Sequence, residues 1–309
     1  MKKLIVSLIT LLLVTHSAYA GMIVAWGVND YGQCDVPEGD DFTTIAASRN
    51  NAWGSFLALR DDGSLASWGM DNIGVPIGND FVDIAVGWNH SLALKSDGSV
   101  LAWGDNSNGQ CDIPSGTFTA ISAGDDYSLA IKTDGSLSLW GVNNSVNSEL
   151  PSGQDFVQVS AAYNYAVALR NDGTLVAWGD DRYGLTTVPL GNDFAVVSAG
   201  GGGGSVGHGI ALQSDGYLVA WGDNSHGQLD IPTGNDFVDI SAGRYHSLAL
   251  RSDGSVEAWG WNPYGELDIP TGISFMDIEA GAYCSFVVTP EPSTILLLGL
   301  GALVLKRKR

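Results

Sequence analysis

The hydrophobic and polar positions of residues 237–270 set a pattern that the rest of the chain repeats. Nearly the same residues recur at 81–114, and weaker copies fill most of the remaining sequence. Within 81–94, hydrophobic residues alternate with small or polar ones with a period of two, which is typical of β-strands. The Asp97-Gly98 pair that follows is a hairpin signal, because Asp tolerates the left-handed region and Gly enters it without a Cβ clash. The pattern therefore predicts short antiparallel strands joined by tight turns.

Each copy carries enough strand signals for one small sheet. Residues 100–103 form a third strand after the hairpin, and residues 110–114 are expected to form a short fourth strand or an extended return. Pro114 suits an outer edge, where no ladder donor is needed. Four short strands in roughly 38 residues, repeated radially, are typical of a β-propeller blade.

A Trp-Gly pair marks each copy and gives the number of blades. Its tryptophans are Trp26, Trp68, Trp103, Trp140, Trp178, Trp221 and Trp259. The first pair has no front half before it, and the last front half, residues 275–288, has no Asp-Gly or Trp-Gly after it. A closed ring would join these halves and remove the exposed edges of an open stack. We therefore predict an all-β, seven-bladed β-propeller whose seventh blade pairs residues 22–26 with residues 285–288.

The repeat resembles the regulator-of-chromosome-condensation repeat. The shared sequences are Ala-Gly-x-x-His-Ser-Leu-Ala-Leu, Asp-Gly, Ala-Trp-Gly and Gly-Gln-Leu/Cys-x-x-Pro, over roughly residues 21–288. The compact spacing and the Asn-rich loops look most similar to secreted bacterial members, among them a β-lactamase-inhibitor propeller. The resemblance implies seven blades with a split closing blade, and the inhibitor-like members use loop aromatics on one face. It is less specific for function, because functions are grafted onto folds.

Both ends of the chain look like targeting segments. Residues 1–20 have the features of a signal peptide: Lys2 and Lys3, then an apolar run, then a small-x-small cleavage site ending at Ala20. The repeat stops after residue 288, and residues 289–309 resemble a PEP-CTERM tail with an apolar run and a basic end. The expected domains are therefore a signal peptide (1–20), the propeller (21–288) and a sorting tail (289–309).

The tail resemblance implies an exosortase-type sorting enzyme as a partner, with Pro290, Glu291 and Pro292 as the sorting motif. As a helix, residues 295–305 would span ~16 Å, short of a ~30 Å hydrocarbon core. With the basic end inside, this run could hold the chain transiently at the inner membrane. An ordinary tail anchor is the alternative. We expect an exported protein, first tethered to the inner membrane and then placed at the cell envelope, the cell surface or the extracellular matrix.

The charge balance argues against nucleic acid as a partner. The chain has 14 Lys and Arg against 34 Asp and Glu, for a formal net charge of −20, and the two ends hold six of the basic residues. Such an acidic surface repels a phosphate backbone. Solubility is a sufficient reason for the acidity, and selection by a basic partner or a cation is the alternative.

The cysteines follow the repeat. Cys34 and Cys111 stand where Leu229 and Leu267 stand in other copies, so we expect buried free thiols rather than a disulfide. One Cys per blade without a Cys-x-x-Cys pair does not indicate a metal site. The Asn/Gly-rich residues 105–110 lack the alternating oxygen ligands of a calcium loop, so no metal or cofactor is predicted.

The histidines follow the repeat as well. His90 and His246 share one position of the repeat with Tyr127, Tyr165 and Cys284. A catalytic base is not usually interchangeable with Tyr, so a structural hydrogen-bonding role is predicted. No catalytic residues stand out, and the first strands consist largely of Ile, Ala, Val and Gly, which does not favour an enzyme that uses the central channel.

Departures from the repeat point to a binding face. Residues 47–56 and the glycine run 200–204 lengthen the turn between the first and second strands of their units. In a meander, this turn and the loop after the third strand emerge on the same face, and insertions in repeat proteins tend to lie on the binding face. The glycine run could instead be a tolerated expansion. Arg49 and Arg244 lie in the same turns, near Asp125 and Asp126.

Aromatic residues gather in these turns and loops, and rigid aromatics dominate interface hot spots. Tyr31, Tyr183 and Tyr264 belong to the same set of loops. The candidate binding residues are Trp53, Trp88, Tyr163, Tyr245, Tyr283, Arg244 and Trp261. The alternative is that several of them pack between adjacent blades.

The sequence therefore favours a secreted, exosortase-sorted surface or matrix propeller that acts as a monomeric, non-catalytic module for binding a protein or glycan. An inhibitor-like propeller that caps a secreted or periplasmic enzyme is the first alternative. An enzyme using the central channel is the second.

Overall fold

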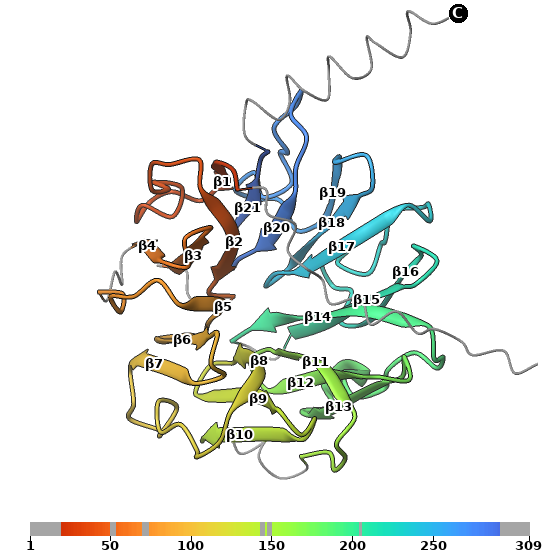
Figure 1. Ribbon diagram of the computed structural model, residues 1–309. Helices are drawn as coiled ribbons and strands as arrows, with labels where there is room; N and C mark the ends of the chain where they lie inside the picture. The colour runs from red at the N-terminus through yellow and green to blue at the C-terminus, as the bar shows by residue number, and fades with distance from the viewer. Residues whose placement is uncertain are drawn as a thin grey trace, which may run out of the picture.

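Seven antiparallel sheets of three strands each are arranged around a central axis in the described part of the chain (Figure 1). The computed structural model describes residues 20–49, 54–69, 74–142, 146, 150–203 and 206–290. The seven-bladed β-propeller predicted from the sequence is therefore confirmed.

Six blades consist of three consecutive strands, the first lying nearest the axis and the third outermost (Figure 1). Blade 1 contains β2 (Phe42–Ala47), β3 (Ser55–Arg60) and β4 (Leu65–Gly69), and blade 2 contains β5 (Phe81–Val86), β6 (His90–Lys95) and β7 (Val100–Gly104). Blade 3 contains β8 (Phe118–Ala123), β9 (Tyr127–Lys132) and β10 (Leu137–Gly141), and blade 4 contains β11 (Phe156–Ala161), β12 (Tyr165–Arg170) and β13 (Leu175–Gly179). Blade 5 contains β14 (Phe194–Gly202), β15 (Val206–Gln213) and β16 (Leu218–Gly222), and blade 6 contains β17 (Phe237–Ala242), β18 (His246–Arg251) and β19 (Val256–Gly260). A short 3-10 turn, η1 (Arg182–Gly184), follows blade 4.

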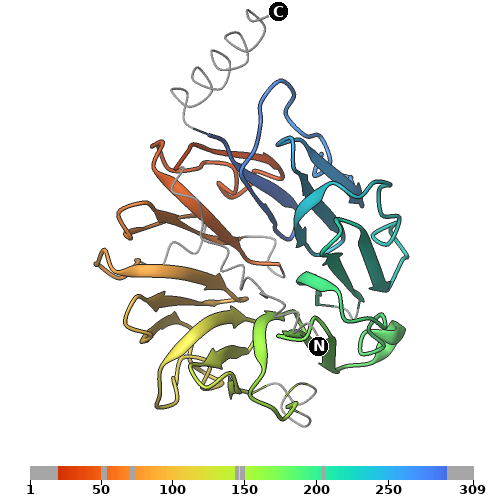
Figure 2. The same cartoon turned by 45° about the vertical axis from the view of Figure 1, so that its right-hand side comes forward.

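The seventh blade joins the two ends of the repeat region. It contains β20 (Asp277–Ala280), β21 (Cys284–Val288) and, as its outer strand, β1 (Ile23–Gly27). Ile23 faces Val288 and Trp26 faces Ser285, as the predicted closure requires. In Figure 2 the N-terminal strand and the C-terminal strands lie side by side. The ring is closed by main-chain pairing between segments at opposite ends of the sequence.

A fourth strand is not formed in the described loops between blades; these residues make the extended return that was the alternative. Asn106 explains the difference. Its Oδ1 accepts a hydrogen bond from the Cys111 N–H (2.8 Å), and its Nδ2 donates to the Asp112 carboxylate (2.9 Å). Because the Asn side chain satisfies a backbone donor that a ladder would use, the loop curls instead of pairing.

Five of the seven Trp-Gly tryptophans tie their blade to the loop that precedes it. The indole N–H of Trp68 donates to the Gln33 carbonyl (2.8 Å), and that of Trp140 donates to the Gln110 carbonyl (2.9 Å). In the split blade, the Trp26 indole donates to the Glu266 carbonyl at 2.7 Å. Five of the seven tryptophans thus bury a large apolar ring and satisfy its polar atom, whereas the buried indole nitrogen of Trp178 has no hydrogen-bond partner among the described residues.

The propeller has two unlike faces. One face, called the rim face here, carries the turns between first and second strands and the loops after third strands. In blade 6 these two segments lie side by side, and the Trp261 N–H donates to the Tyr245 carbonyl (3.0 Å). On the opposite hairpin face lie the Asp-Gly turns, where the Phe81 N–H donates to the Gly63 carbonyl of the preceding blade (3.2 Å). The predicted placement of the two loop sets on one face is correct.

The hairpin face carries a repeated ion-pair motif that the sequence reasoning missed. The Arg60 guanidinium lies 4.3 Å from the centroid of the Phe42 ring and pairs with Asp41. The same arrangement recurs with Lys95, Arg170 and Arg251 in blades 2, 4 and 6. Cation–π contacts at partly exposed sites contribute about 0.5–1 kcal/mol each, so the motif stabilises the start of the first strand in these four blades.

Candidate functional site

Five aromatic side chains from three consecutive blades meet on the rim face. This aromatic cluster consists of His226, Tyr245, Trp261, Tyr264 and Tyr283. Ring centroids are 5.2 Å apart for Tyr245 and Trp261, and 5.6 Å apart for Tyr264 and Tyr283. The Tyr264 side chain is 54% exposed, so the cluster faces solvent.

Arg244 completes the cluster. Its guanidinium carbon lies 5.0 Å from the centroid of Tyr245 and 5.2 Å from that of Tyr283. One of its terminal nitrogens donates to the Gly203 carbonyl at 3.0 Å, which ties blade 6 to the glycine run of blade 5. The charge is therefore held in a fixed position between two ring faces.

The cluster exists because the loop after blade 6 departs from the repeat. Trp261 stands where blades 2 and 5 have Asp105 and Asp223, and Glu266 stands where they have Gln. The Glu266 side chain is 1% exposed and accepts a hydrogen bond from the Tyr264 N–H (3.0 Å). Burial raises the pKa of Glu266. The substitution of Asp by Trp was visible in the sequence, but only the fold shows that Trp261 meets four other rings.

The structure unites four of the predicted binding residues and separates the others. Tyr245, Tyr283, Trp261 and Arg244 form the aromatic cluster, to which His226 adds a ring that was not selected. Trp88 is 40% exposed in the turn of blade 2, and Tyr163 lies in the turn of blade 4, so neither borders the cluster. Trp53 lies outside the described residues.

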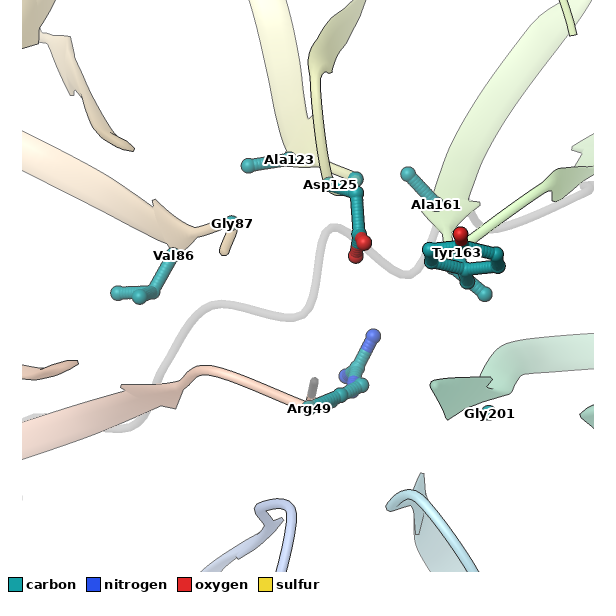
Figure 3. Close-up of a pocket in the computed structure, with 10 residues that line it drawn as sticks. Arg49, Val86, Gly87, Ala123, Asp125, Ala161, Tyr163 and Gly201 are labelled. Carbon is teal, nitrogen blue, oxygen red and sulfur yellow. The ribbon is translucent and has the colours of Figure 1, made fainter. Parts of the chain in front are cut away.

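Tyr163 instead borders a small pocket at the rim-face mouth of the central channel (Figure 3). Arg49 and Asp125 point toward each other across this pocket. The Arg49 guanidinium donates to the Ala199 carbonyl (3.2 Å) and forms an ion pair with Glu279 at 3.5 Å. Arg49 therefore bridges blade 1 to blades 5 and 7 across the mouth.

The channel is more polar than the sequence reasoning expected. A cavity of about 220 Å³ is lined by first-strand residues that include Asp83, Glu279 and Gln158. The first strands do contain Ile, Ala and Val, but their third and fifth residues turn toward the channel, and these positions carry the carboxylates and serines. The expectation of first strands without convergent polar groups was therefore wrong, because it treated residues of both faces as one set.

Burial in the channel wall raises the pKa values of its carboxyl groups. It raises the pKa of Asp83 and of Asp239 to about 6. The pKa of Asp277 is raised well above its ordinary value, first by burial and then by the charges of Asp239 and Glu279. The pKa of Glu279 is raised by burial, with Arg49 acting in the opposite direction.

These polar groups bind neighbouring blades together. The Ser160 hydroxyl accepts a hydrogen bond from the Ala199 N–H (3.0 Å), and Gln158 accepts from the Val197 N–H (3.0 Å). Serine bonds of the same kind join Ser122 to Ala161, Ser198 to Ala242 and Ser241 to Ala280. Glu279 closes the series, because it accepts from the Ala47 N–H of blade 1 at 3.3 Å. The channel side chains thus link the first strands of consecutive blades from blade 3 through blade 7 to blade 1.

The histidine position also links blades, as predicted. The His90 Nε2 lies 2.9 Å from the Ser128 hydroxyl of the next blade, and His246 contacts Ser285 in the same way (2.9 Å). Burial lowers the pKa of both imidazoles to about 4. In blade 3, the Tyr127 hydroxyl instead donates to the Ala162 and Tyr165 carbonyls at 3.0 Å.

All three cysteines are free, as predicted, but their burial differs. Cys284 is buried, whereas Cys34 and Cys111 are partly exposed. The Cys111 thiol donates to the Asp105 carbonyl (3.3 Å), and the Asp105 carboxylate accepts from Ser107 and Gln110. Within the described residues, no three His, Cys, Asp or Glu side chains come together in a way that could hold a metal ion.

Four segments of the chain match the regulator of chromosome condensation (RCC1) repeat: residues 81–110, 156–185, 203–228 and 237–266. These segments lie in blades 2, 4, 5 and 6, so four of the seven blades match the RCC1 repeat. Residues 288–309 match the PEP-CTERM protein-sorting motif, which implies export, sorting to the cell surface and processing by an exosortase. The resemblances to the RCC1 repeat and to the PEP-CTERM tail are confirmed. The similarity to a β-lactamase-inhibitor propeller stays a prediction.

Solved structures share the fold at low sequence identity. Human WBSCR16 is 16% identical with a TM-score of 0.70, over 87% of this chain and 99% of that one. Prp20p from Saccharomyces cerevisiae is 16% identical with a TM-score of 0.69, over 90% and 94%. The ectodomain of the Physcomitrella patens receptor kinase CR4 is 21% identical with a TM-score of 0.65, over 79% and 69%. Such likeness shows the fold alone.

No match to the chain is found among curated proteins. In the part of the chain that the structure describes, no helical segment has the length and apolarity that a membrane crossing needs.

Proposed function

We propose that this exported propeller is a non-catalytic binding module and that the aromatic cluster on its rim face is the centre of the binding surface. The observation that carries the proposal is the convergence of five rings and Arg244 from three blades at a solvent-exposed site. Tyr, Trp and Arg are the residue types that dominate interface hot spots. Prp20p, which shares the fold, is described as binding Gsp1p and histones, so a propeller with this fold can bind proteins.

A protein fits the cluster better than a glycan strand. Four of the seven ring pairs in the cluster meet nearly at right angles, among them Tyr245 with Trp261 (77°) and Trp261 with Tyr264 (87°). Rings arranged in this way present edges and corners rather than one flat platform for stacked sugar rings. Arg244, fixed between two tyrosines, adds a directed donor of the kind that pairs with a carboxylate.

The channel supports the non-catalytic part of the proposal. Its serines and Glu279 accept hydrogen bonds from main-chain N–H groups of the next blade, so they hold the ring together. An inhibitor-like propeller that caps an enzyme is the narrower form of the same proposal, with the enzyme as the bound protein.

Export and sorting complete the proposal. Residues 1–20 are removed as a signal peptide, residues 21–288 form the domain, and the tail tethers the chain to the inner membrane until an exosortase-type enzyme removes it. The partner is then a protein at the cell envelope or outside it, the module acts as a monomer, and the acidic surface excludes nucleic acid. An intact mass that still includes Arg309 in protein from the native host would contradict the removal of the tail.

A matched pair of tyrosines tests the binding surface. Tyr264 is 54% exposed in the aromatic cluster, and Tyr217 is 49% exposed beside an Asp-Gly turn on the hairpin face. We expect Tyr264→Ala and Tyr245→Ala each to weaken binding of the envelope partner by ~1–3 kcal/mol, with little effect on folding. The measurement is the affinity for partner captured from native envelope with mature protein. Tyr217→Ala is the control and should leave the affinity unchanged.

Two results would contradict this assignment. If Tyr217→Ala abolishes binding while the cluster variants do not, the binding face is wrong. If capture survives protease treatment of the envelope but not oxidation of its sugars, the partner is a glycan. Trp88→Ala tests how far the surface extends, because Trp88 lies on the same face away from the cluster.

A further inference from the structure

The sorting motif begins at the place in blade 7 where other blades have their hairpin turn. Strand β21 corresponds to β6 of blade 2, so Val288 and Thr289 occupy the positions of Leu94 and Lys95. Pro290, Glu291 and Pro292 then occupy the positions of Ser96, Asp97 and Gly98 in the sequence. The chain therefore leaves the ordered ring on the hairpin face, opposite the aromatic cluster.

No linker separates the folded blade from the motif. Thr289 is 2% exposed, its N–H donates to the Met22 carbonyl (2.9 Å), and its hydroxyl donates to the same oxygen (3.3 Å). Pro290, the first residue of the motif, is buried as well. Gly21 packs so closely here that a Cβ would lie 1.4 Å from the Thr289 carbonyl oxygen. The two residues before Glu291 are thus part of the join that closes the ring.

We propose that this join controls the access of the sorting enzyme to its motif, an inference that rests on the sorting in the proposed function. An enzyme that binds an extended peptide pairs with main-chain groups along the segment. Thr289 already uses its N–H inside the propeller, and Pro290 has no N–H. The enzyme therefore binds the whole motif only when residues 289–290 have detached from Met22.

Detachment is a local event. Strand ends open without unfolding the rest of a domain, so access is slowed rather than abolished. Cleavage breaks one peptide bond of the tail, the acyl part passes to water or an amine, and the C-terminal fragment leaves with a new amino group. Because the β1–β21 ladder ends at Val288, the ring stays closed whichever bond after Pro290 is cut.

Two insertions in the full-length chain test the proposal in the native host. The insertion of Gly-Ser-Gly-Ser between Thr289 and Pro290 moves the motif away from the blade and leaves the ladder intact. We expect this variant to lose its tail about tenfold faster, followed by mass spectrometry after pulse labelling. The matched control places the same insertion between Ser293 and Thr294. It lengthens the tail by the same number of residues and leaves Pro290 directly after Thr289. This control should be processed at the unaltered rate.

Equal rates for the first variant and the unaltered chain would overturn the proposal, as would equal acceleration by both insertions. Melting temperatures of the three propellers verify that the ring is closed in each. If the unaltered chain keeps its tail, the sorting itself is refuted, and this inference with it. If only the proposed control of access fails, all three chains still lose their tails, so the two failures are distinguishable.

Discussion

At the scale of single residues, paired positions fit adjacent blades together. At three junctions, a His near the start of one second strand meets a Ser near the start of the second strand in the next blade. His90 meets Ser128 and His246 meets Ser285, whereas Tyr127 precedes a blade that has Ala166 at the serine position. The longer Tyr side chain reaches past the small residue to main-chain carbonyls. The choice of His or Tyr is therefore set by the partner position.

This pairing predicts a coupling energy at the junction of blades 3 and 4. Tyr127→His should destabilise the fold by ~2–4 kcal/mol, because it removes two hydrogen bonds and leaves a cavity. Adding Ala166→Ser should restore the His–Ser bond seen elsewhere, with a favourable coupling of about 1–2 kcal/mol. Denaturant unfolding of the two single variants and the double variant measures it. Strict additivity would refute the pairing.

At the scale of elements, each first strand serves two roles through its alternation. In β17, Ile240 packs in the core between blades, while Asp239 and Ser241 turn to the channel. Burial raises the pKa of the Asp239 carboxyl group to about 6. A group with a raised folded pKa contributes stability at low pH, and this stability is lost as the pH rises through 6.

Ionisation of Asp239 therefore lowers the stability of the fold at higher pH, and one substitution should remove this effect. Asp239→Asn keeps an acceptor for the Ile240 N–H but cannot ionise. We expect it to stabilise the fold by about 1–2 kcal/mol at about pH 8 and to change little at about pH 4. Asp253→Asn in the exposed turn of the same blade is the matched control. There, hydrogen bonds from Ser255 lower the carboxyl pKa, so the substitution should cost stability at the higher pH. If both substitutions change the melting temperature in the same direction at the higher pH, the proposed destabilisation by ionised Asp239 is contradicted.

At the scale of the whole molecule, closure depends on one short strand. β1 fills the outer position of blade 7, and its Trp26 packs in the buried hydrophobic core between blades 6 and 7. The Trp26 indole donates to the Glu266 carbonyl, directly below the aromatic cluster. Closure of the ring and the geometry of the proposed binding surface are therefore linked.

Removal of β1 should destabilise the entire ring. Deletion of residues 22–27 exposes the edge of β21 and removes a buried Trp, so we expect a loss of at least ~3 kcal/mol in unfolding free energy. Thermal unfolding of the exported domain measures it. Tyr31→Ala, a change at a 44% exposed side chain just after the strand, is the control and should have little effect. An unchanged melting temperature after the deletion would contradict the prediction that the stability of the domain depends on closure of the ring by β1.

Much of the fold followed from the sequence because the repeat is strong and local. Period-two alternation, the Asp-Gly turns and seven Trp-Gly pairs predicted the strands and their number, and the two incomplete copies predicted the join of β1 with β21. Of the two forms expected for residues 110–114, the fourth strand does not form, because the side chain of Asn106 competes for backbone hydrogen bonds over a span of five residues. Such competition is decided by loop geometry, which alternation does not describe.

The sites depended on tertiary structure for a physical reason. Tyr245, Trp261 and Tyr283 were separate candidates in the sequence. Only the rotation from blade to blade brings the rings of Tyr245 and Tyr283 close to that of Trp261, with centroid distances of 5.2 and 5.9 Å. The interaction between channel carboxylates could not be predicted for the same reason. Asp239 and Asp277 lie 38 positions apart in the sequence, but in the ring they are close enough for the charge of Asp239 to raise the pKa of Asp277. The sequence by itself determined what each blade is, because that information lies within one repeat. The closed ring decided what the blades form together, because proximity across blades depends on closure and on the direction each side chain takes from its strand.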